Sequence, residues 1–190
     1  MRDLPSWPLH TRRLVIRPIE PDDIKPMWEY RGLPDVTTWT SAYFTTYDQW
    51  RDAATASQGS RVVATLPDGR IVGDAALDVS DAWHQAGSKS TAALSSVAEL
   101  GWAVHPDHSG LGYATEMAAA LLQVAFRDIG VRRVTASAFA DNAASIRVME
   151  KIGMRREATT LADSWHATRG WTDGAWYALL ADEWESGIRR

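Results

Sequence analysis

The chain has 190 residues, of which 45% are hydrophobic and 23% are charged, and its formal net charge is −4. This length and composition predict one domain over residues 1–190 with its own core, and they exclude a disordered or fibrous chain. The chain has no cysteine, which excludes a disulfide framework, a thiolate metal site and a cysteine nucleophile.

The charge and the N-terminal segment limit the partners to be expected. A net charge of −4 provides no basic footprint for phosphate backbones, so nucleic-acid binding is not expected. Residues 1–14 contain two prolines and three arginines but no continuous apolar run. Nowhere do about eighteen apolar residues follow one another, as a membrane span requires. We therefore expect a cytoplasmic protein without a membrane partner.

The first sixty residues predict one strand and two helices. Leu14–Arg17 is a short β-rich run, and a proline with two acids at residues 21–23 is typical of a helix start. Thr46 and Gln49 are spaced as a capping box and predict a second helix that ends near Gly59.

A hairpin and a long loop are predicted next. The β-rich runs Arg61–Leu66 and Arg70–Val79 are separated by the turn sequence Pro-Asp-Gly at residues 67–69, which requires an antiparallel hairpin. Ser80–Ser96 is rich in Ser, Ala, Gly and Lys without periodicity, and this composition predicts a mobile loop.

The second half of the chain alternates strands with helices. The predicted elements are a strand at Val97–Val104, a helix that follows Gly110–Gly112 and closes at Gly130, a strand at Val131–Phe139, a helix from Asn142 to Gly153, and two closing strands, the last at Ala175–Leu180. This order of elements predicts an α/β fold around one mixed sheet.

Residues 99–116 place a strand, a glycine loop and a helix start in immediate succession. The first turn of a helix has unpaired N–H groups and a partial positive charge, so it can hold a pyrophosphate. Gly110 and Gly112 allow close backbone approach and positive φ angles. By themselves the glycines fit an ordinary strand-to-helix turn equally well.

Several segments resemble one family. Ser109–Ala114 resembles the acyl-CoA pyrophosphate loop of GNAT acetyltransferases, although Ser109 stands where Gln or Arg is usual. Asn142–Met154 is similar to the second half of that CoA site. Leu9–Arg17 and Asp173–Trp184 resemble the opening and closing strands of the RimJ/RimL branch, the ribosomal-protein N-acetyltransferases. The resemblance covers nearly the whole chain except the loop at residues 80–96.

The resemblance implies a fold and a cofactor. The expected fold is a single mixed, mostly antiparallel sheet of about six to seven strands, flanked by helices and splayed between the fourth and fifth strands. The expected co-substrate is acetyl-CoA, and the implied activity is N-acetyltransfer. The implied cofactor-binding positions are Trp102, Val104, Ser109, Gly110, Leu111, Gly112, Tyr113, Ala114, Thr115 and Asn142.

Glu99 is an acid in an otherwise apolar strand, on the face opposite Leu100 and Trp102. Burying an acid is costly unless it is paired. Glu99 therefore either binds an arginine or serves chemistry at the open end of the sheet, and the resemblance favours a catalytic role as base or amine-orienting group.

Asn142 and Ser145 have two interpretations. By sequence alone, Asn142 is an N-cap and Ser145 lies in the first turn of its helix. In similar enzymes the asparagine contacts the pantetheine arm, and a serine at this position protonates the leaving thiolate. The tyrosine that GNAT enzymes often use for this is absent, because Met154 follows Gly153. Ser145 is therefore the catalytic acid that the resemblance implies.

Trp39 and Tyr43 are the predicted acceptor-binding residues, and Phe44 is a third aromatic residue that the sequence places beside them. They lie in the irregular stretch between the first two helices, where relatives shape the acceptor pocket, although ordinary packing also accounts for them. The five histidines include no His-x-x-x-His pair, so no metal site is expected.

The sequence favours a direct reaction, because no cysteine is present to carry the acetyl group. The resemblance to the RimJ/RimL branch implies a peptide or protein α-amine as the favoured acceptor. A small-molecule amine such as a polyamine, amino acid or aminoglycoside is the main alternative, and a non-catalytic acyl-CoA sensor is a third hypothesis. The chain could act as a monomer or as a homodimer.

Overall fold

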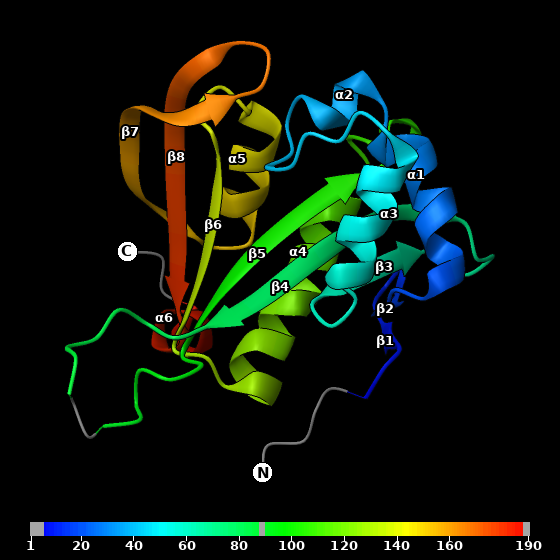
Figure 1. Cartoon of the computed structure of the whole chain (residues 1–190). Helices are drawn as coiled ribbons and strands as arrows, with labels where there is room; N and C mark the ends of the chain where they lie inside the picture. The colour runs from blue at the N-terminus through cyan, green and yellow to red at the C-terminus, as the bar shows by residue number, and fades with distance from the viewer. Residues whose placement is uncertain (1–5, 88–89, 188–190) are drawn as a thin grey trace.

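The computed structural model describes residues 6–87 and 90–187, which form one sheet with the strand order β1-β2-β3-β4-β5-β6-β8-β7 (Figure 1). The predicted single mixed sheet is confirmed, with eight strands in place of the expected six to seven. The strands are β1 (Leu9–His10), β2 (Val15–Pro18), β3 (Arg61–Thr65), β4 (Ile71–Ser80), β5 (Val97–Val104), β6 (Arg133–Phe139), β7 (Arg155–His166) and β8 (Gly170–Leu180).

Helices cover both faces of the sheet (Figure 1). In chain order they are η1 (Pro21–Asp23), α1 (Ile24–Arg31), α2 (Pro34–Thr37), α3 (Tyr47–Ala56), η2 (Pro106–His108), α4 (Tyr113–Gln123), η3 (Val124–Ile129), α5 (Ala143–Lys151) and α6 (Ala181–Ser186). The segments η1 and η2 are 3-10 helices, and η3 is π-helical. No helix among the described residues is long and apolar enough to cross a membrane.

The local signals that predicted the helices act largely as expected. The side chain of Thr46 accepts a hydrogen bond from the Gln49 N–H at 3.4 Å and caps α3. The Gln49 side chain accepts from the Thr45 N–H at 3.0 Å, so the box closes one residue earlier than predicted. Gly130 has a φ of 78° and ends the helix that begins with α4, as predicted.

The last strand ends at Leu180, as the sequence predicted, and β8 begins earlier than expected, at Gly170. The segment that resembles the closing strand extends to Trp184, but residues 181–186 form α6. The Leu180 N–H donates to the Glu183 carboxylate at 2.9 Å, which caps the new helix. Trp184 then packs on the Phe126 ring with centroids 5.4 Å apart.

The core consists of two clusters on opposite faces of the sheet. One cluster lies against α4 and includes Leu100 and Met117, which are 2% and 1% exposed. The other lies under α1 and α3 and includes the fully buried Met27 and Trp50. The alternation predicted for Val97–Val104 is confirmed, because Leu100 belongs to the first cluster and Ala103 to the second.

The sheet opens between β5 and β6. These parallel strands pair only from Val97 with Arg133 to Glu99 with Thr135. Beyond these pairs β5 continues to Val104 and β6 to Phe139, and the strands diverge (Figure 1). The gap lies between the two strands for which the splay was expected, and it leaves one edge of β5 accessible.

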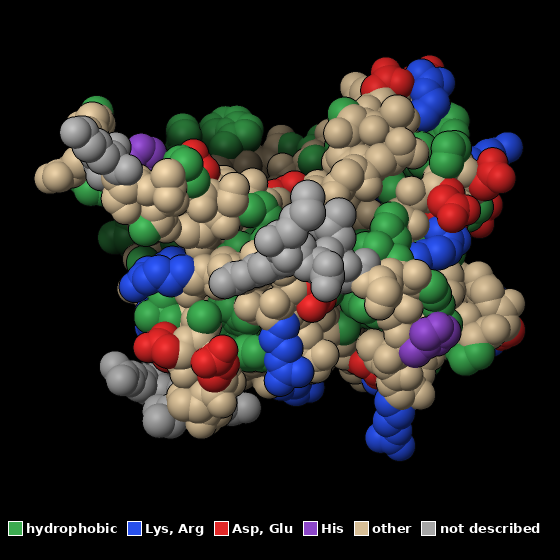
Figure 2. Space-filling model, turned by 90° about the horizontal axis from the view of Figure 1, so that it is seen from below, with side chains coloured by type: hydrophobic (Ala, Val, Ile, Leu, Met, Phe, Trp, Pro, Cys, Tyr) green, Lys and Arg blue, Asp and Glu red, His purple; other side chains and the backbone are tan. Residues whose placement is uncertain are grey.

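The loop predicted at residues 80–96 contains no helix or strand at the described residues 81–87 and 90–96. Its two arms are joined near the sheet, where the Ala82 N–H donates to the Ala93 carbonyl at 2.8 Å. The loop extends from the lower end of the sheet in Figure 1. Figure 2 shows this end of the molecule, where acidic and basic side chains are interspersed.

Candidate active site

Two cavities meet where β5 and β6 diverge. The first, of about 290 Å³, lies between the loop before α4 and the start of α5. The second, of about 340 Å³, lies on the face of the sheet that carries α1 and α3. Four side chains line both cavities: Trp39, Thr40, Trp102 and Ser145. Molecules bound in the two cavities could therefore contact each other at this junction.

The first cavity surrounds the N-terminal end of α4, where Gly110 and Gly112 have φ angles of 75° and 84°. These angles favour glycine. Gly112 is the N-cap of α4, so the N–H groups of the first turn and their partial positive charge face the cavity. The predicted cofactor-binding positions that line this cavity are Trp102, Val104, Ser109, Gly110, Gly112, Tyr113, Ala114, Thr115 and Asn142.

Leu111 is the predicted cofactor-binding residue that does not line the cavity. Its side chain is 53% exposed, and its carbonyl accepts a hydrogen bond from Arg13 Nη1 at 2.8 Å. The same arginine donates from Nε to Glu116 at 2.7 Å and lies over the Tyr113 ring. The hydroxyl of Thr11 donates to Glu116 at 2.6 Å. These contacts fix the glycine loop to the chain segment that precedes β2.

Glu116 is ionised in this arrangement. Partial burial would raise the pKa of its carboxyl group, but the hydrogen bonds from Thr11 and Arg13 outweigh this effect and lower the pKa. The carboxylate lies in the first turn of α4, where a negative charge interacts favourably with the helix dipole.

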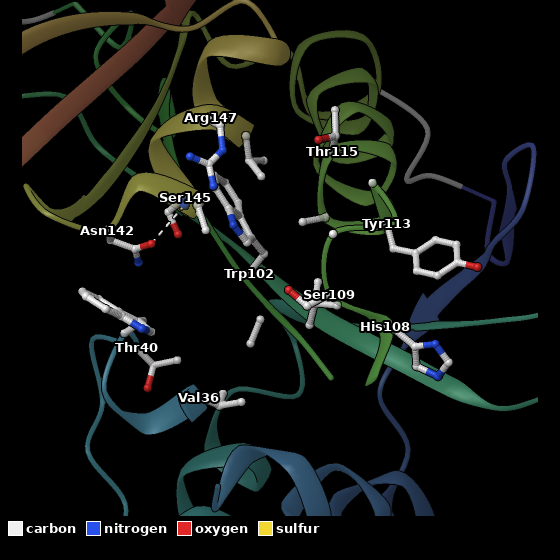
Figure 3. A pocket seen from close by; sticks show the side chains of 18 of the residues that line it. Val36, Thr40, Trp102, His108, Ser109, Tyr113, Thr115, Asn142, Ser145 and Arg147 are labelled. Carbon is white, nitrogen blue, oxygen red and sulfur yellow. Dashed lines mark hydrogen bonds between the residues drawn. The ribbon is translucent and has the colours of Figure 1, made fainter. Parts of the chain in front are cut away.

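Two cations that the sequence analysis did not single out line the first cavity. Arg147 and Lys151 lie four residues apart on α5, and this spacing places both on the same face of the helix. In Figure 3, α5 presents Arg147 across the cavity from Thr115 on α4. Two cations and a helix N-terminus fit a ligand with phosphate groups.

The open edge of β5 presents backbone groups to the junction. The His105 N–H donates to Val72 in β4, whereas the Ala98 carbonyl accepts from the Thr135 hydroxyl in β6 at 3.3 Å. Backbone groups alternate in direction along a strand, so the N–H groups of Trp102 and Val104 face β6. Since β6 has diverged at this level, these donors are available to a ligand.

Asn142 is the N-cap of α5, as predicted from the sequence. Its side-chain oxygen accepts a hydrogen bond from the Ser145 N–H at 3.1 Å, which Figure 3 shows as a dashed line. The bond uses the backbone of Ser145, so the Ser145 hydroxyl is free of the capping role. Ser145 lines both cavities.

Glu99 lines the second cavity and is exposed. Glu99 is therefore not a buried acid, because α1 and α3 cover the other end of this face of the sheet. Among the described residues its side-chain contact is the Ser137 hydroxyl at 3.4 Å, and no arginine pairs with it. The structural alternative, an ion pair with arginine, is thus not observed within residues 6–87 and 90–187.

Of the two predicted acceptor-binding residues, Trp39 lines both cavities. Tyr43 is 49% exposed and lines neither; Phe44 lines the second cavity instead. The segment that carries Trp39 is fixed to the β7–β8 hairpin, because Arg169 lies over the Trp39 ring and the His166 ring is 3.0 Å from the Thr38 carbonyl. This segment therefore bridges the gap in the sheet.

Comparison with known proteins identifies the family. Residues 13–155 match the family described as the acetyltransferase (GNAT) domain. The match includes β5, the glycine loop, α4 and α5. The chain belongs to the GNAT acetyltransferase family.

A curated relative is the uncharacterized N-acetyltransferase YnaD of Bacillus subtilis, which is 38% identical over 86 residues. This match covers 45% of the chain and 50% of YnaD, so the chain spans about half the length of this relative. A solved GNAT-family acetyltransferase from Bacillus anthracis is 29% identical with a TM-score of 0.77, over 92% of this chain and 98% of the other.

Two more remote structures share the fold. Mycobacterium smegmatis RimJ in complex with CoA-disulfide is 20% identical with a TM-score of 0.73, over 90% of this chain and 83% of RimJ. A chimera of the spermidine N-acetyltransferase SpeG from Vibrio cholerae and hSSAT is 13% identical with a TM-score of 0.71, over 91% and 98% of the two chains.

Proposed function

We propose that this chain transfers the acetyl group of acetyl-CoA directly to the α-amine of a peptide or protein N-terminus. The observation that carries the proposal is the junction of the two cavities at Trp102 and Ser145. Both substrates can be bound at once there, so the acetyl group needs no carrier on the protein. The absence of cysteine agrees with a direct transfer.

The first cavity positions the donor. Acetyl-CoA supplies the thioester and carries a pyrophosphate, for which the N-terminus of α4 and Arg147 provide N–H donors and positive charge. At the junction, the free N–H groups of Trp102 and Val104 would donate to the thioester carbonyl oxygen. Fixed donors of this kind stabilise the negative charge that develops on the oxygen during attack.

The second cavity positions the acceptor. The neutral amine nitrogen attacks the thioester carbon, a C–N bond forms and the C–S bond breaks. Glu99 receives the proton that the amine loses, directly or through water, and the Ser145 hydroxyl donates a proton to the leaving thiolate. Ser145 then regains a proton from water as Glu99 releases one to water. Both side chains line this cavity, so each is placed for its step.

An α-amine suits a site whose base is a carboxylate. Its pKa is about 7.7 to 8.0, against about 10.4 for a lysine side chain, so a larger fraction is neutral near pH 7. The loop at residues 80–96 could have narrowed the site for a small molecule, but none of its described residues lines either cavity. This arrangement supports an acceptor site that is open to a peptide.

A small-molecule amine is the second candidate acceptor. The second cavity, of about 340 Å³, is within the range of pockets that enclose small ligands. A non-catalytic acyl-CoA sensor is the third hypothesis, and it predicts binding of acetyl-CoA without amine-dependent release of CoA.

A free-thiol assay of CoA release tests the proposal across N-terminal peptides, polyamines, amino acids and aminoglycosides. We expect release with peptides that have a free α-amine and none with their N-acetylated forms. Release with a polyamine or aminoglycoside but with no peptide would establish the second candidate. Acetyl-CoA binding without release by any amine would establish the sensor.

The role of Glu99 is tested by Glu99→Gln at saturating amine. We expect lower turnover and a pH–rate profile that differs from that of the wild type, because the variant lacks the base. Glu29→Gln, an exposed acid of α1 that lines neither cavity, is the matched control. Wild-type turnover and pH profile in Glu99→Gln would show that Glu99 is not the base.

A further inference from the structure

The second cavity has charges of opposite sign at its two ends. Arg31 and Arg61 line one end, and Asp78 and Glu99 line the other. The two acids at the second end can bind an acceptor amine that arrives as an ammonium ion. The arginines at the first end have no role in the reaction as described above.

The arginine end has one positive charge in excess. Arg31 Nε and Arg61 Nη1 donate to the fully buried Asp74 at 2.8 and 2.6 Å, and the Tyr30 hydroxyl donates to the same carboxylate at 2.6 Å. Burial would raise the pKa of Asp74, but the charges of the arginines outweigh it and lower the pKa. Asp74 is therefore ionised and neutralises one guanidinium of the two.

The acid end has two negative charges without a cation. Asp78 in β4 is the register partner of Glu99 in β5, so their side chains share a face with Cβ atoms about 5 Å apart. Both are exposed, and among the described residues neither has an ion-pair partner. Like charges directly opposite each other destabilise a sheet, and an ammonium group between the two would remove this repulsion.

The two ends lie along the direction of the strands. Arg61 pairs with Ala76 in β4, two residues before Asp78, so its backbone is about 7 Å from the acids along the strand. Its guanidinium extends to Asp74, which is about 13 Å from Asp78. Gly101 pairs with Ala76 from the other side, and a Cβ placed on it would meet no atom within 4 Å. The floor between the ends is thus made of small residues with open space above it.

We infer that the amine-bearing residue of the acceptor also carries a carboxylate, which binds Arg31 and Arg61 while the amine lies against Asp78 and Glu99. This inference rests on the proposed acetyl transfer to an α-amine and specifies the chemistry of the residue that carries this amine. A free amino acid supplies such a carboxylate at its α-carbon, and a peptide supplies it when its first residue is acidic. A polyamine is disfavoured, because its second ammonium would meet the arginines.

Two pairs of acceptors identify the carboxylate and its source. Leucine is compared with leucinamide, and a peptide amide beginning with Asp is compared with the same peptide beginning with Asn; spermidine is assayed alongside. Each is tested by CoA release with the wild type, with Arg61→Gln and with the control Arg70→Gln. Arg70 lies in the β3–β4 turn, pairs with Asp68 and is 67% exposed.

We expect the carboxylate member of one pair to be preferred at least about tenfold in kcat/KM, because a hydrogen bond between two charged groups contributes a tenfold change or more. Arg61→Gln should reduce that preference toward unity, and Arg70→Gln should retain it. The leucine pair would indicate a free amino acid, and the peptide pair an acidic N-terminus. Arg61→Gln retains the bidentate Arg31 contact to Asp74, so the variant should fold.

The inference is wrong if neither pair shows a preference, if Arg61→Gln lowers both members of a pair equally, or if spermidine is the best acceptor. Thermal stabilisation of the CoA-bound protein by the same compounds gives a second measurement that needs no turnover. Preferential stabilisation by the carboxylate members without CoA release would contradict the proposed transfer and support the carboxylate site. If the two members of each pair gave equal stabilisation and equal CoA release, the carboxylate site itself would be contradicted.

Discussion

Replacing Asp74 by Asn removes the carboxylate that holds α1, β3 and β4 together. Asp74 is 0% exposed and accepts hydrogen bonds from Tyr30, Arg31 and Arg61. In Asp74→Asn two guanidinium groups lose their counter-ion, and Arg31, which is 9% exposed, cannot recover full hydration. Removing one partner of a buried ion pair costs about 3–5 kcal/mol.

A loss of this size is easily measured. For a chain of this length it lowers the melting temperature by roughly 6–20 °C, at about 2–4 °C per kcal/mol. Asp78→Asn is the matched control, because Asp78 lies on the same strand and face but is exposed and should change the free energy of unfolding by less than about 0.5 kcal/mol. Thermal and urea unfolding of both variants measure the difference.

The same variant has a defined pH dependence. The pKa of Asp74 is lowered in the folded state, so the unfolded chain binds more protons and the contribution of Asp74 to stability rises with pH. The difference between wild type and Asp74→Asn should be complete above about pH 5 and should narrow as the pH falls below the unfolded value of about 3.9. A difference below about 1 kcal/mol at pH 7, or one that grows in acid, would refute the assignment of Asp74 as an ionised structural anchor.

The remaining predictions concern the two cavities. Acetyl-CoA at 100 times its Kd should stabilise the fold by about 2.7 kcal/mol, and Gly112→Val should abolish this stabilisation. The φ of Gly112 is 84°, an angle that valine does not readily adopt, so the glycine loop would change shape. An unchanged thermal shift would show that the donor binds elsewhere. Ser145→Ala should lower turnover with little change in acetyl-CoA affinity or stability, since the capping bond uses the Ser145 N–H; a loss of stability alone would argue against the acid role. Gly101→Val should raise the KM for the acceptor at least about tenfold while acetyl-CoA still protects the fold; equal KM values would show that the amine binds elsewhere.

The order of the main elements could be predicted because their signals are local. The cap at Thr46, the turn at residues 67–69 and the helix stop at Gly130 each act within a few residues. α2 was missed because it is only four residues long, too short to show a period. β1, of two residues, was not separated from the opening strand that the resemblance placed at Leu9–Arg17. β7 was predicted only as an unbounded strand, and it carries register shifts between Arg156 and Ala158 and between Thr160 and Ser164, which interrupt the alternation that defines a strand in sequence.

Most of the lining of the first cavity could also be predicted from the sequence. The glycine loop and the N-terminus of α4 are contiguous, so one segment contains both the turn and the donors. Arg147 and Lys151 were missed, although their spacing of four residues on a predicted helix was visible. The spacing did not show that α5 faces α4 across the cavity, because this arrangement depends on tertiary packing (Figure 3).

The charged lining of the second cavity could not be predicted, because these side chains are brought together only by the packing of elements that lie far apart in the sequence. Asp74 and Asp78 are four residues apart in β4 and face the same side of the sheet, about 13 Å from each other. In sequence they are equivalent acids in an apolar strand. They differ because α1 and α3 cover only one end of this face, so Asp74 is buried with two arginines and Asp78 is exposed opposite Glu99. The opposite charges at the two ends of the cavity thus follow from where the helices stop covering the sheet.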